Sequence, residues 1–362
     1  MRKLFTRSTI ILLWIALISG ALYLPTWEFV RHEENTINVF AWGDILEPDV
    51  IADFEKETGI KVNVSHYFSN EELIVKLKAT GAAGYDLIIP SDYAVAILKN
   101  GDLIKEIDKT KFNYWDAINP SLKGLAYDPD NTYSIPWEWE MYGFGIDRDY
   151  FKDKLQDKSF DPSWKLLFDP HTVDYQITMV NDPIEAVEFA SFYLFGLKST
   201  FSEDDFRQIK EVLVRQRSWV TAYANFRGDY FLATRTCPLI IASSAYIWRT
   251  MRQFDFVSYV TPKEGSFISV ENICLPKTSQ KEELVYRFIN YIYSPESVAK
   301  HYTSYGYFPS TLHALPLLEL DPQAEKFIRS TPQEFQKHHF LQRIAPQEKV
   351  RDIWVEVKSG DF

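Results

Sequence analysis

The sequence predicts an α/β protein of two lobes, each built on a mainly parallel sheet flanked by helices. The chain has 362 residues, more than a single hydrophobic core usually supports. Strand-like and helix-like segments alternate near the N-terminus, as in parallel sheets with crossover helices, and a second alternating set follows after about residue 142. No repeat or low-complexity linker separates the two sets, so we expect ordered strands to join the lobes.

The composition narrows the class of partner. Hydrophobic residues make up 46% of the chain and charged residues 25%, which is ordinary for a globular protein and excludes a disordered or multi-span membrane chain. The formal net charge of −11 argues against nucleic acid as a partner and favours a cationic one. Aromatic residues reach 16%, which suits a site that encloses an apolar or cationic ligand as well as a large core.

The N-terminus resembles an export signal in layout. Arg2, Lys3 and Arg7 precede an apolar stretch over residues 10–24, and small residues at 19–21 would allow cleavage after Ala21. The alternative is an uncleaved anchor, because residues 10–30 approach the length that spans a bilayer. No cysteine follows the stretch, so lipid anchoring there is excluded. Both alternatives place the remainder outside the cytoplasm.

The first elements form a β-α-β-α-β pattern. The expected strands cover residues 37–41, 60–67 and 84–90, and the expected helices cover 47–58 and 71–79. Gly59 should end the first of these helices, and Asn70 should cap the second. This order predicts parallel strands. Trp42-Gly43-Asp44 and Ser91-Asp92-Tyr93 then follow strands one and three, at the sheet edge where open α/β sheets bind ligands, unless they only begin loops.

The second set of elements begins with two strand-like runs, 133–139 and 142–147, the latter crossing into the second lobe. Further strands are expected at 175–180, 239–242 and 271–276, and helices at 184–197, 204–216, 281–293 and 295–302, with a mostly helical tail from residue 332.

Three local features have competing interpretations. Asp182-Pro-Ile-Glu185 opens a helix after a strand, so its carboxylates either form a capping box or face a cleft, or do both. Cys237 and Cys274 lie in apolar runs and are either a disulfide or two buried thiols. The scattered histidines, including the pair His338-His339 in the helical tail, do not have the spacing of a metal site.

Several segments, in order and at their spacing, resemble the periplasmic spermidine/putrescine-binding proteins of polyamine ABC importers. The resemblance runs from about residue 37 to the C-terminus. The matching segments are Phe54-Glu-Lys-Glu-Thr-Gly-Ile-Lys-Val, Tyr85-Asp-Leu-Ile-Ile-Pro-Ser-Asp-Tyr, Tyr133-Ser-Ile-Pro-Trp, Pro262-Lys-Glu-Gly, Asn290-Tyr-Ile-Tyr-Ser-Pro-Glu and Gly306-Tyr-Phe-Pro. The first is shared by many type II solute-binding proteins, whereas the later ones point to the polyamine branch.

The resemblance implies a type II periplasmic-binding-protein fold with ligand held in the cleft between discontinuous lobes. Residues 36–142 and 271–317 would form lobe 1, and 143–270 and 318–362 would form lobe 2. The ligand would be spermidine or putrescine, delivered to the membrane permease of an ABC importer by a monomeric, non-enzymatic receptor without cofactor or metal. The implied ligand-binding residues are Trp42, Ser91, Tyr93, Asp182, Glu185, Glu271, Tyr307 and Gln342.

The implied roles follow polyamine chemistry, in which ammonium groups need carboxylates and methylenes need flat walls. Asp182 and Glu185 would grip a terminal amine, and Glu271 an ammonium further along. Trp42, Tyr93 and Tyr307 would form walls, and Ser91 and Gln342 would give polar contacts.

This chain departs from the family pattern at three aromatic positions, which here are Ile45, Ile241 and Ser269. Candidates to replace the aromatics are Trp137, Trp139, Tyr246 and Trp248, and candidates to add negative charge are Asp44, Glu138 and Glu140. The ligand could therefore differ from spermidine in length or amine spacing.

Two other functions stay open from sequence. The same fold could bind a metal ion, thiamine or an amino-phosphonate. A carboxylate-based hydrolase could use Asp182 and Glu185 as acid and base, although no nucleophile motif, phosphate loop or metal set accompanies them.

Overall fold

The computed structural model describes Trp14 and residues 35–156, 159–224, 227–335, 338–341 and 344–359. The described residues from Ile37 onward belong to one compact unit. Apart from Trp14, the expected export or anchor segment lies outside the described residues. Within the described part, no helix has the length and apolar character needed to cross a membrane.

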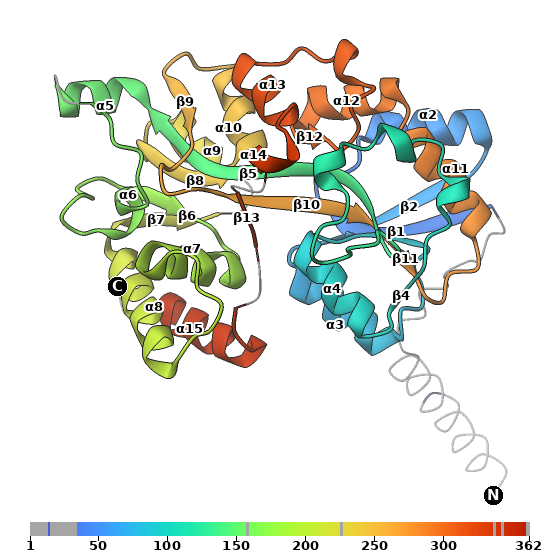
Figure 1. Cartoon of the computed structure of the whole chain (residues 1–362), viewed down its shortest axis with the longest axis horizontal. Helices are drawn as coiled ribbons and strands as arrows, with labels where there is room; N and C mark the ends of the chain where they lie inside the picture. The colour runs from blue at the N-terminus through green and yellow to red at the C-terminus, as the bar shows by residue number, and fades with distance from the viewer. Residues whose placement is uncertain are drawn as a thin grey trace, which may run out of the picture. The chain divides into compact units, whose positions relative to one another are not determined.

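The N-terminal half of this compact unit is the expected β-α-β-α-β arrangement. Its sheet has the strand order β2-β1-β3, and β1 and β3 run parallel. The strands are β1 (Thr36–Trp42), β2 (Lys61–Tyr67) and β3 (Leu87–Ile89), and the helices are α2 (Pro48–Thr58), α3 (Asn70–Thr80) and α4 (Asp92–Asn100). Figure 1 shows these elements together with α11 (Glu282–Ile292) in one group, called here the first lobe.

The ends of these helices follow from capping residues. Gly59 ends α2 in the left-handed region at φ 71°, as expected. The prediction that Asn70 caps α3 was wrong: the Ser69 side chain accepts the Glu72 N–H at 3.2 Å. Asn70 instead is buried, and its side-chain amide donates to Ser91 Oγ at 3.0 Å. Its side chain therefore serves a tertiary contact and is not free to cap.

A second sheet of eight strands has the order β13-β10-β5-β8-β6-β7, with β9 and β12 also paired to β5. β6 is parallel to β7 and β8, whereas β5 is antiparallel to β8, β9, β10 and β12, so this sheet is mixed. Its strands are β5 (Ile135–Asp147), β6 (Ile177–Met179), β7 (Val220–Tyr223), β8 (Leu239–Ser243), β9 (Val257–Val260), β10 (Phe267–Ile273), β12 (Phe308–Pro309) and β13 (His339–Phe340).

Helices α7 (Pro183–Phe195), α8 (Glu203–Gln216) and α15 (Gln347–Ser359) lie with β6, β7 and β8 in a second group, called here the second lobe (Figure 1). Smaller elements complete the chain: β4 (Ile104–Lys105), α5 (Arg148–Leu155), α6 (Lys165–Phe168), α9 (Gly228–Ala233), α10 (Ser244–Met251), β11 (Leu275–Pro276), α12 (Pro295–Tyr305), α13 (Pro322–Ile328), α14 (Pro332–Phe335) and short 3-10 turns at Lys109–Lys111, Trp115–Ala117, Pro120–Leu122, Arg217–Trp219 and Leu315–Leu317. The two-lobed α/β prediction is confirmed, although the second sheet is mixed and not mainly parallel, because every pairing of β5 is antiparallel. The proposed lobe boundaries stay a prediction.

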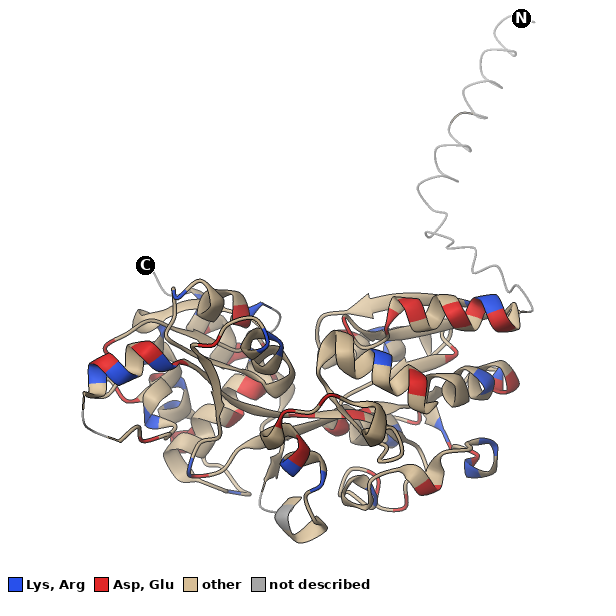
Figure 2. Ribbon diagram, turned by 90° about the horizontal axis from the view of Figure 1, so that it is seen from above, with Lys and Arg blue, Asp and Glu red and all other residues tan. Residues whose placement is uncertain are grey.

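Two long strands join the lobes. The two runs expected at 133–139 and 142–147 are one continuous strand, β5. β5 and β10 pass from one group to the other (Figure 1), and Figure 2 shows ribbon coloured red for Asp and Glu between the two groups. An isolated bridge between Ser91 and Glu271 ties β10 to the end of β3. The edge of the first lobe at the carboxyl end of β3 therefore meets the connecting strands.

The C-terminal tail is less helical than the sequence suggests. His339, expected in a helix, belongs to β13, which pairs in parallel with β10 through Phe267. The backbone hydrogen bonds of this pairing use groups that a helix would have satisfied internally, so tertiary pairing overrides local preference.

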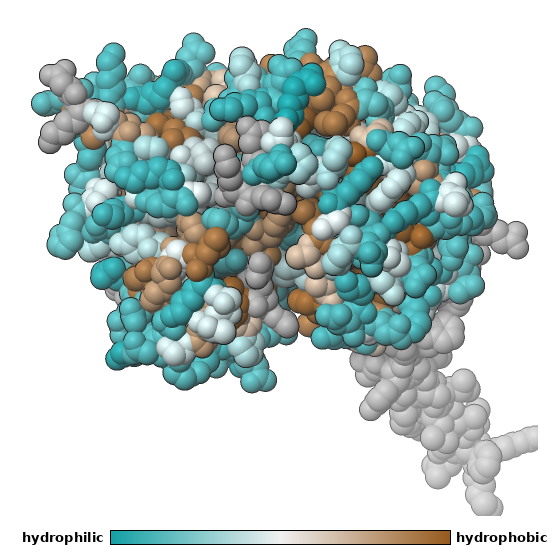
Figure 3. Space-filling model, viewed as in Figure 1, coloured by the Kyte–Doolittle hydropathy of each residue, from teal (hydrophilic) through white to brown (hydrophobic). Residues whose placement is uncertain are grey.

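Both cysteines are buried free thiols, which decides against the disulfide. Cys237 and Cys274 lie in two different clusters of the hydrophobic core. Hydrophilic side chains cover most of the face seen in Figure 3.

Candidate functional site

A cavity lies where the lobes meet the connecting strands. About 640 Å³ of empty space lies among its lining residues, counting the part open to solvent. Its lining residues are Trp42, Gly43, Ile45, Ser91, Glu138, Glu140, Tyr142, Val180, Glu185, Ala224, Ala242, Ser243, Tyr246, Ser269, Glu271 and Tyr307. As far as the structure describes the chain, this lining contains four glutamates and no lysine, arginine or histidine.

The register of β5 and β10 arranges the floor of the cavity. Alternate residues of a strand share one face, so Glu138, Glu140 and Tyr142 point to the same side of β5. In the antiparallel pairing Glu138 lies opposite Glu271 and Glu140 opposite Ser269. Side chains directly opposite one another are about 5 Å apart at Cβ, and like charges there repel. The floor is therefore a patch where a cation would relieve repulsion.

Glu271 is held by hydroxyl groups from both sides. Ser91 Oγ donates to its Oε1 at 2.7 Å and Ser269 Oγ to the same atom at 3.1 Å. Its Oε2 has no hydrogen-bond partner in the described part of the chain, although the residue is only 8% exposed. Burial, which outweighs the Ser91 hydrogen bond, raises the pKa of Glu271 well above its usual range.

Glu185 lies in the first turn of α7. The Tyr142 hydroxyl donates to Glu185 Oε1 at 2.6 Å. Asp182 precedes the helix, and its Oδ1 accepts the backbone N–H groups of Ile184 at 2.8 Å and Glu185 at 3.0 Å. Burial, reinforced by the nearby charge of Asp182, raises the pKa of Glu185 well above its usual range.

The two β5 glutamates differ in their partners. Glu138 is 2% exposed and contacts Nε2 of His301, a residue of α12. Burial raises the pKa of Glu138 and lowers the pKa of His301 to about 3. Both groups therefore favour their uncharged forms. Glu140 is half-buried, accepts a hydrogen bond from Ser243 Oγ, and has a pKa raised by burial to about 8.

Aromatic rings form the walls. The half-buried Trp42 packs on the fully buried Tyr67, with ring centroids 4.7 Å apart, and its indole Nε1 has no hydrogen-bond partner. Tyr307 donates its hydroxyl to that of Tyr246 at 3.2 Å. Flat walls of this kind suit methylene groups and cations.

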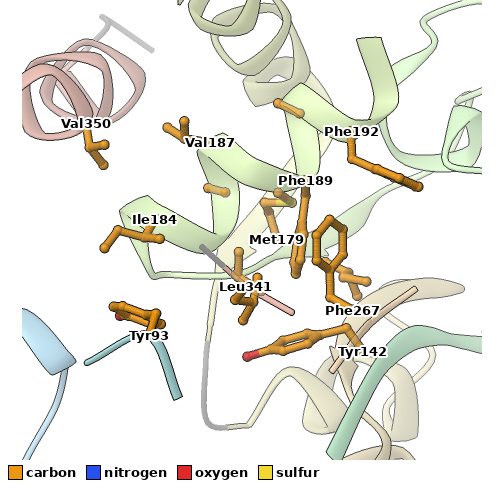
Figure 4. Close-up of a cluster of buried hydrophobic side chains, with 14 of the residues drawn as sticks. Tyr93, Tyr142, Met179, Ile184, Val187, Phe189, Phe192, Phe267, Leu341 and Val350 are labelled. Carbon is orange, nitrogen blue, oxygen red and sulfur yellow. The ribbon is translucent and has the colours of Figure 1, made fainter. Parts of the chain in front are cut away.

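The structure brings five of the eight expected ligand-binding residues to the cavity lining: Trp42, Ser91, Glu185, Glu271 and Tyr307. Asp182 is buried behind Glu185 as the N-cap of α7 and does not line the cavity. Tyr93 is also outside the lining and lies beside Ile184 at the edge of a buried cluster (Figure 4). Gln342 lies outside the described residues.

The positions that depart from the family pattern divide into two kinds. Ile45 and Ser269 line the cavity, whereas Ile241 is fully buried on β8. Of the candidate replacements, Tyr246 lines the cavity, whereas Trp137, Trp139 and Trp248 belong to a core cluster. Trp137 and Trp139 are buried there because they lie on the face of β5 opposite to the glutamates of the floor. Glu138 and Glu140 line the cavity, and Asp44 is exposed outside it.

Sequence reasoning missed Tyr142 and Ser243 as lining residues. The alternation Glu138-Trp139-Glu140-Met141-Tyr142 carried the signal for Tyr142, since polar atoms recur at every second position. Ser243 became a lining residue only through the pairing of β8 with β5, where it lies opposite Tyr142.

The acidic cavity does not have the form of a metal centre. Among the described residues, no group of three or more histidine, cysteine, aspartate or glutamate side chains is placed to hold a metal ion. The carboxylates face the cavity as separate acceptors, which suits a ligand with several hydrogen-bond donors.

The fold and the site define a two-lobed protein with an acidic cavity at the junction of its lobes. The family model described as bacterial extracellular solute-binding protein matches residues 49–326, and the chain belongs to this family.

The relatives agree with the resemblance drawn from the sequence motifs, which is confirmed. The putrescine-binding periplasmic protein PotF of Escherichia coli (strain K12) is 27% identical over 363 residues, covering 96% of this chain and 98% of the relative. The spermidine/putrescine-binding periplasmic protein of the same organism is 27% identical over 352 residues, covering 95% and 97%. A solved structure titled putative spermidine/putrescine ABC transporter, from Listeria monocytogenes, is 26% identical with a TM-score of 0.77, covering 90% of this chain and 99% of that one.

Proposed function

We propose that this protein is an extracytoplasmic receptor that binds a polyamine in the cavity and delivers it to the permease of an ABC importer. The observation that carries the proposal is the cavity lining, with four glutamates and no basic residue. A polyamine offers ammonium groups along an aliphatic chain, and carboxylates bind ammonium groups through charge-assisted hydrogen bonds.

The walls support the same ligand class. Trp42 and Tyr307 would cover methylenes, while Glu185 and Glu271 would bind ammonium groups from opposite lobes. Binding from both lobes would favour the closed arrangement, because only that arrangement makes both sets of contacts. The two curated relatives described above are named for putrescine or spermidine binding, which supports the ligand class.

Calorimetry with an amine panel tests the proposal. Putrescine, spermidine and spermine are titrated into the protein at low and high salt, together with thiamine, an amino-phosphonate and a ferric salt. We expect heat with at least one amine, weaker binding at high salt, and none with the other compounds. At about 100 times the dissociation constant the ligand should stabilise the fold by roughly 2.7 kcal/mol, measurable as a higher Tm.

Matched variants locate the site. Glu185→Gln should weaken amine binding by about 1.5–3 kcal/mol, because a charge-assisted hydrogen bond is lost. Glu211→Gln, an exposed position on α8, should leave affinity unchanged. Absence of heat and of any Tm shift with all three amines at low salt would refute the proposal, as would preferential binding of a non-amine.

A further inference from the structure

Glu140 occupies a central place among the cavity acids. Its neighbour on the same face of β5, Tyr142, donates to Glu185 of the second lobe. Its cross-strand neighbour, Ser269, donates to Glu271 at the edge of the first lobe. The charge of Glu140 also acts on both outer carboxyls and raises the pKa of each. Glu140 therefore lies between two carboxylates that come from opposite sides of the cavity.

Glu140 is also the more accessible of the two β5 glutamates. Glu138 is almost fully buried and already contacts His301. Glu140 is half-buried, and Ser243 Oγ is its hydrogen-bond partner among the described residues. A carboxylate has room for about four hydrogen bonds, so one serine leaves most of that capacity for a ligand.

An independent observation comes from an unsatisfied carboxylate oxygen of the floor, although the charge of Arg249, which is outside the lining, acts on Glu140. Among the described residues Glu271 Oε2 has no hydrogen-bond partner, and the residue lines the cavity while it is more than nine-tenths buried. A buried carboxylate oxygen without a partner is costly, and none of the lining residues offers a positive charge. A ligand with two positive charges would pair with two of the glutamates Glu140, Glu185 and Glu271 and leave the third without a counter-charge.

We propose that Glu140 binds a middle cationic nitrogen of the ligand, so that the preferred ligand carries at least three cationic nitrogens along its chain. This inference rests on the proposed function and adds to it a preference for triamines or longer amines over diamines. Glu185 and Glu271 would bind the flanking nitrogens. The serine and tyrosine hydroxyl groups that donate to these carboxylates would hold the acceptors in place for the ligand.

Two ligands of equal length isolate the middle nitrogen. Spermidine and octane-1,8-diamine have the same number of chain atoms between their terminal nitrogens and differ in one group, a secondary ammonium in place of a methylene. Wild-type protein should bind spermidine at least about tenfold more tightly. In Glu140→Gln this preference should fall by about tenfold, because the middle ammonium is then desolvated without a counter-charge, while affinity for the diamine should change little.

The controls separate the possible outcomes. Glu211→Gln should keep the wild-type preference, and circular dichroism with Tm measurement verifies that Glu140→Gln is folded. If Glu140→Gln does not fold, Glu140→Ala serves in its place, since it also removes the charge. An unchanged preference in a folded variant, or equal binding of the two ligands by wild type, refutes the inference while leaving polyamine binding intact. Failure of wild type to bind any amine refutes the proposed function as well.

Discussion

At the residue scale, the cavity is a set of carboxyl groups whose ionisation burial opposes. Burial is the largest cause of the raised pKa at Glu138, Glu140, Glu185 and Glu271. Hydroxyl groups of serine and tyrosine partly offset it, because they donate to the charged form. The empty cavity therefore favours protonated carboxyls, and a bound cation favours ionised ones.

Stability of the ligand-free protein should consequently fall as pH rises. Glu140 titrates near 4.5 in a model peptide and near 8 in the folded protein, so the folded state holds more protons between these values. The contribution of Glu140 to the free energy of unfolding is complete below about pH 4.5 and is lost progressively up to about pH 8. Chemical denaturation of wild type and Glu140→Gln across this range measures it.

The variant should gain stability relative to wild type as pH rises to about 8, with no further gain above. A difference between wild type and variant that does not change with pH would contradict the raised pKa. Amine binding should release protons below pH 8, which calorimetry in buffers of different ionisation enthalpy detects, and affinity should increase with pH over the same range.

At the element scale, the floor of the cavity depends on the close packing of β5. β5 supplies the floor, and its packing permits no side chain at Gly143, where an added Cβ would meet the Tyr259 ring at 2.4 Å. The sheet behind the floor is thus closely packed, so that Tyr142 and Glu140 on the other face have a rigid support.

The N-cap of α7 offers a second test at this scale. Asp182 accepts two backbone N–H groups, and asparagine caps about as well, so Asp182→Asn should change stability by only a few tenths of a kcal/mol. Asp182→Ala should lose about 0.5–2 kcal/mol, measured by denaturant unfolding. Because Asp182 does not line the cavity, Asp182→Asn should weaken amine binding much less than Glu185→Gln does.

Equal losses of affinity in Asp182→Asn and Glu185→Gln would instead assign Asp182 to direct contact with the ligand. Strong coupling in the double variant would support the same conclusion, since two carboxylates that share one ammonium lose less together than separately.

At the scale of the whole molecule, two lobes are held together without a covalent cross-link. Cys237 and Cys274 lie in separate clusters of the core, and burial raises the pKa of both thiols. Reductant should therefore leave the Tm unchanged. A thiol reagent should react slowly with the native protein, because both thiols are buried. After unfolding without reductant, the reagent should modify two thiols per chain. Fewer than two reactive thiols in the unfolded chain would indicate a disulfide.

The fold class and about half of the site could be predicted from the sequence. Hydrophobic periodicity and the order of elements determined the two α/β lobes, and the motif resemblance located Trp42, Ser91, Glu185, Glu271 and Tyr307. The prediction of the elements succeeded because strand ends and helix starts are encoded locally, by alternation, glycine and capping residues, whereas the five residues came from the resemblance, and their binding of a ligand stays a prediction.

Only the tertiary structure decided which polar groups meet in the cavity. The register of β5 against β10 sets Glu138 opposite Glu271 and Glu140 opposite Ser269, and the contact with His301 distinguishes Glu138 from Glu140. The burial of Trp137 and Trp139 and the strand at His339 were decided in the same way. Register and burial depend on contacts between residues far apart in the chain, and local sequence preference does not contain that information.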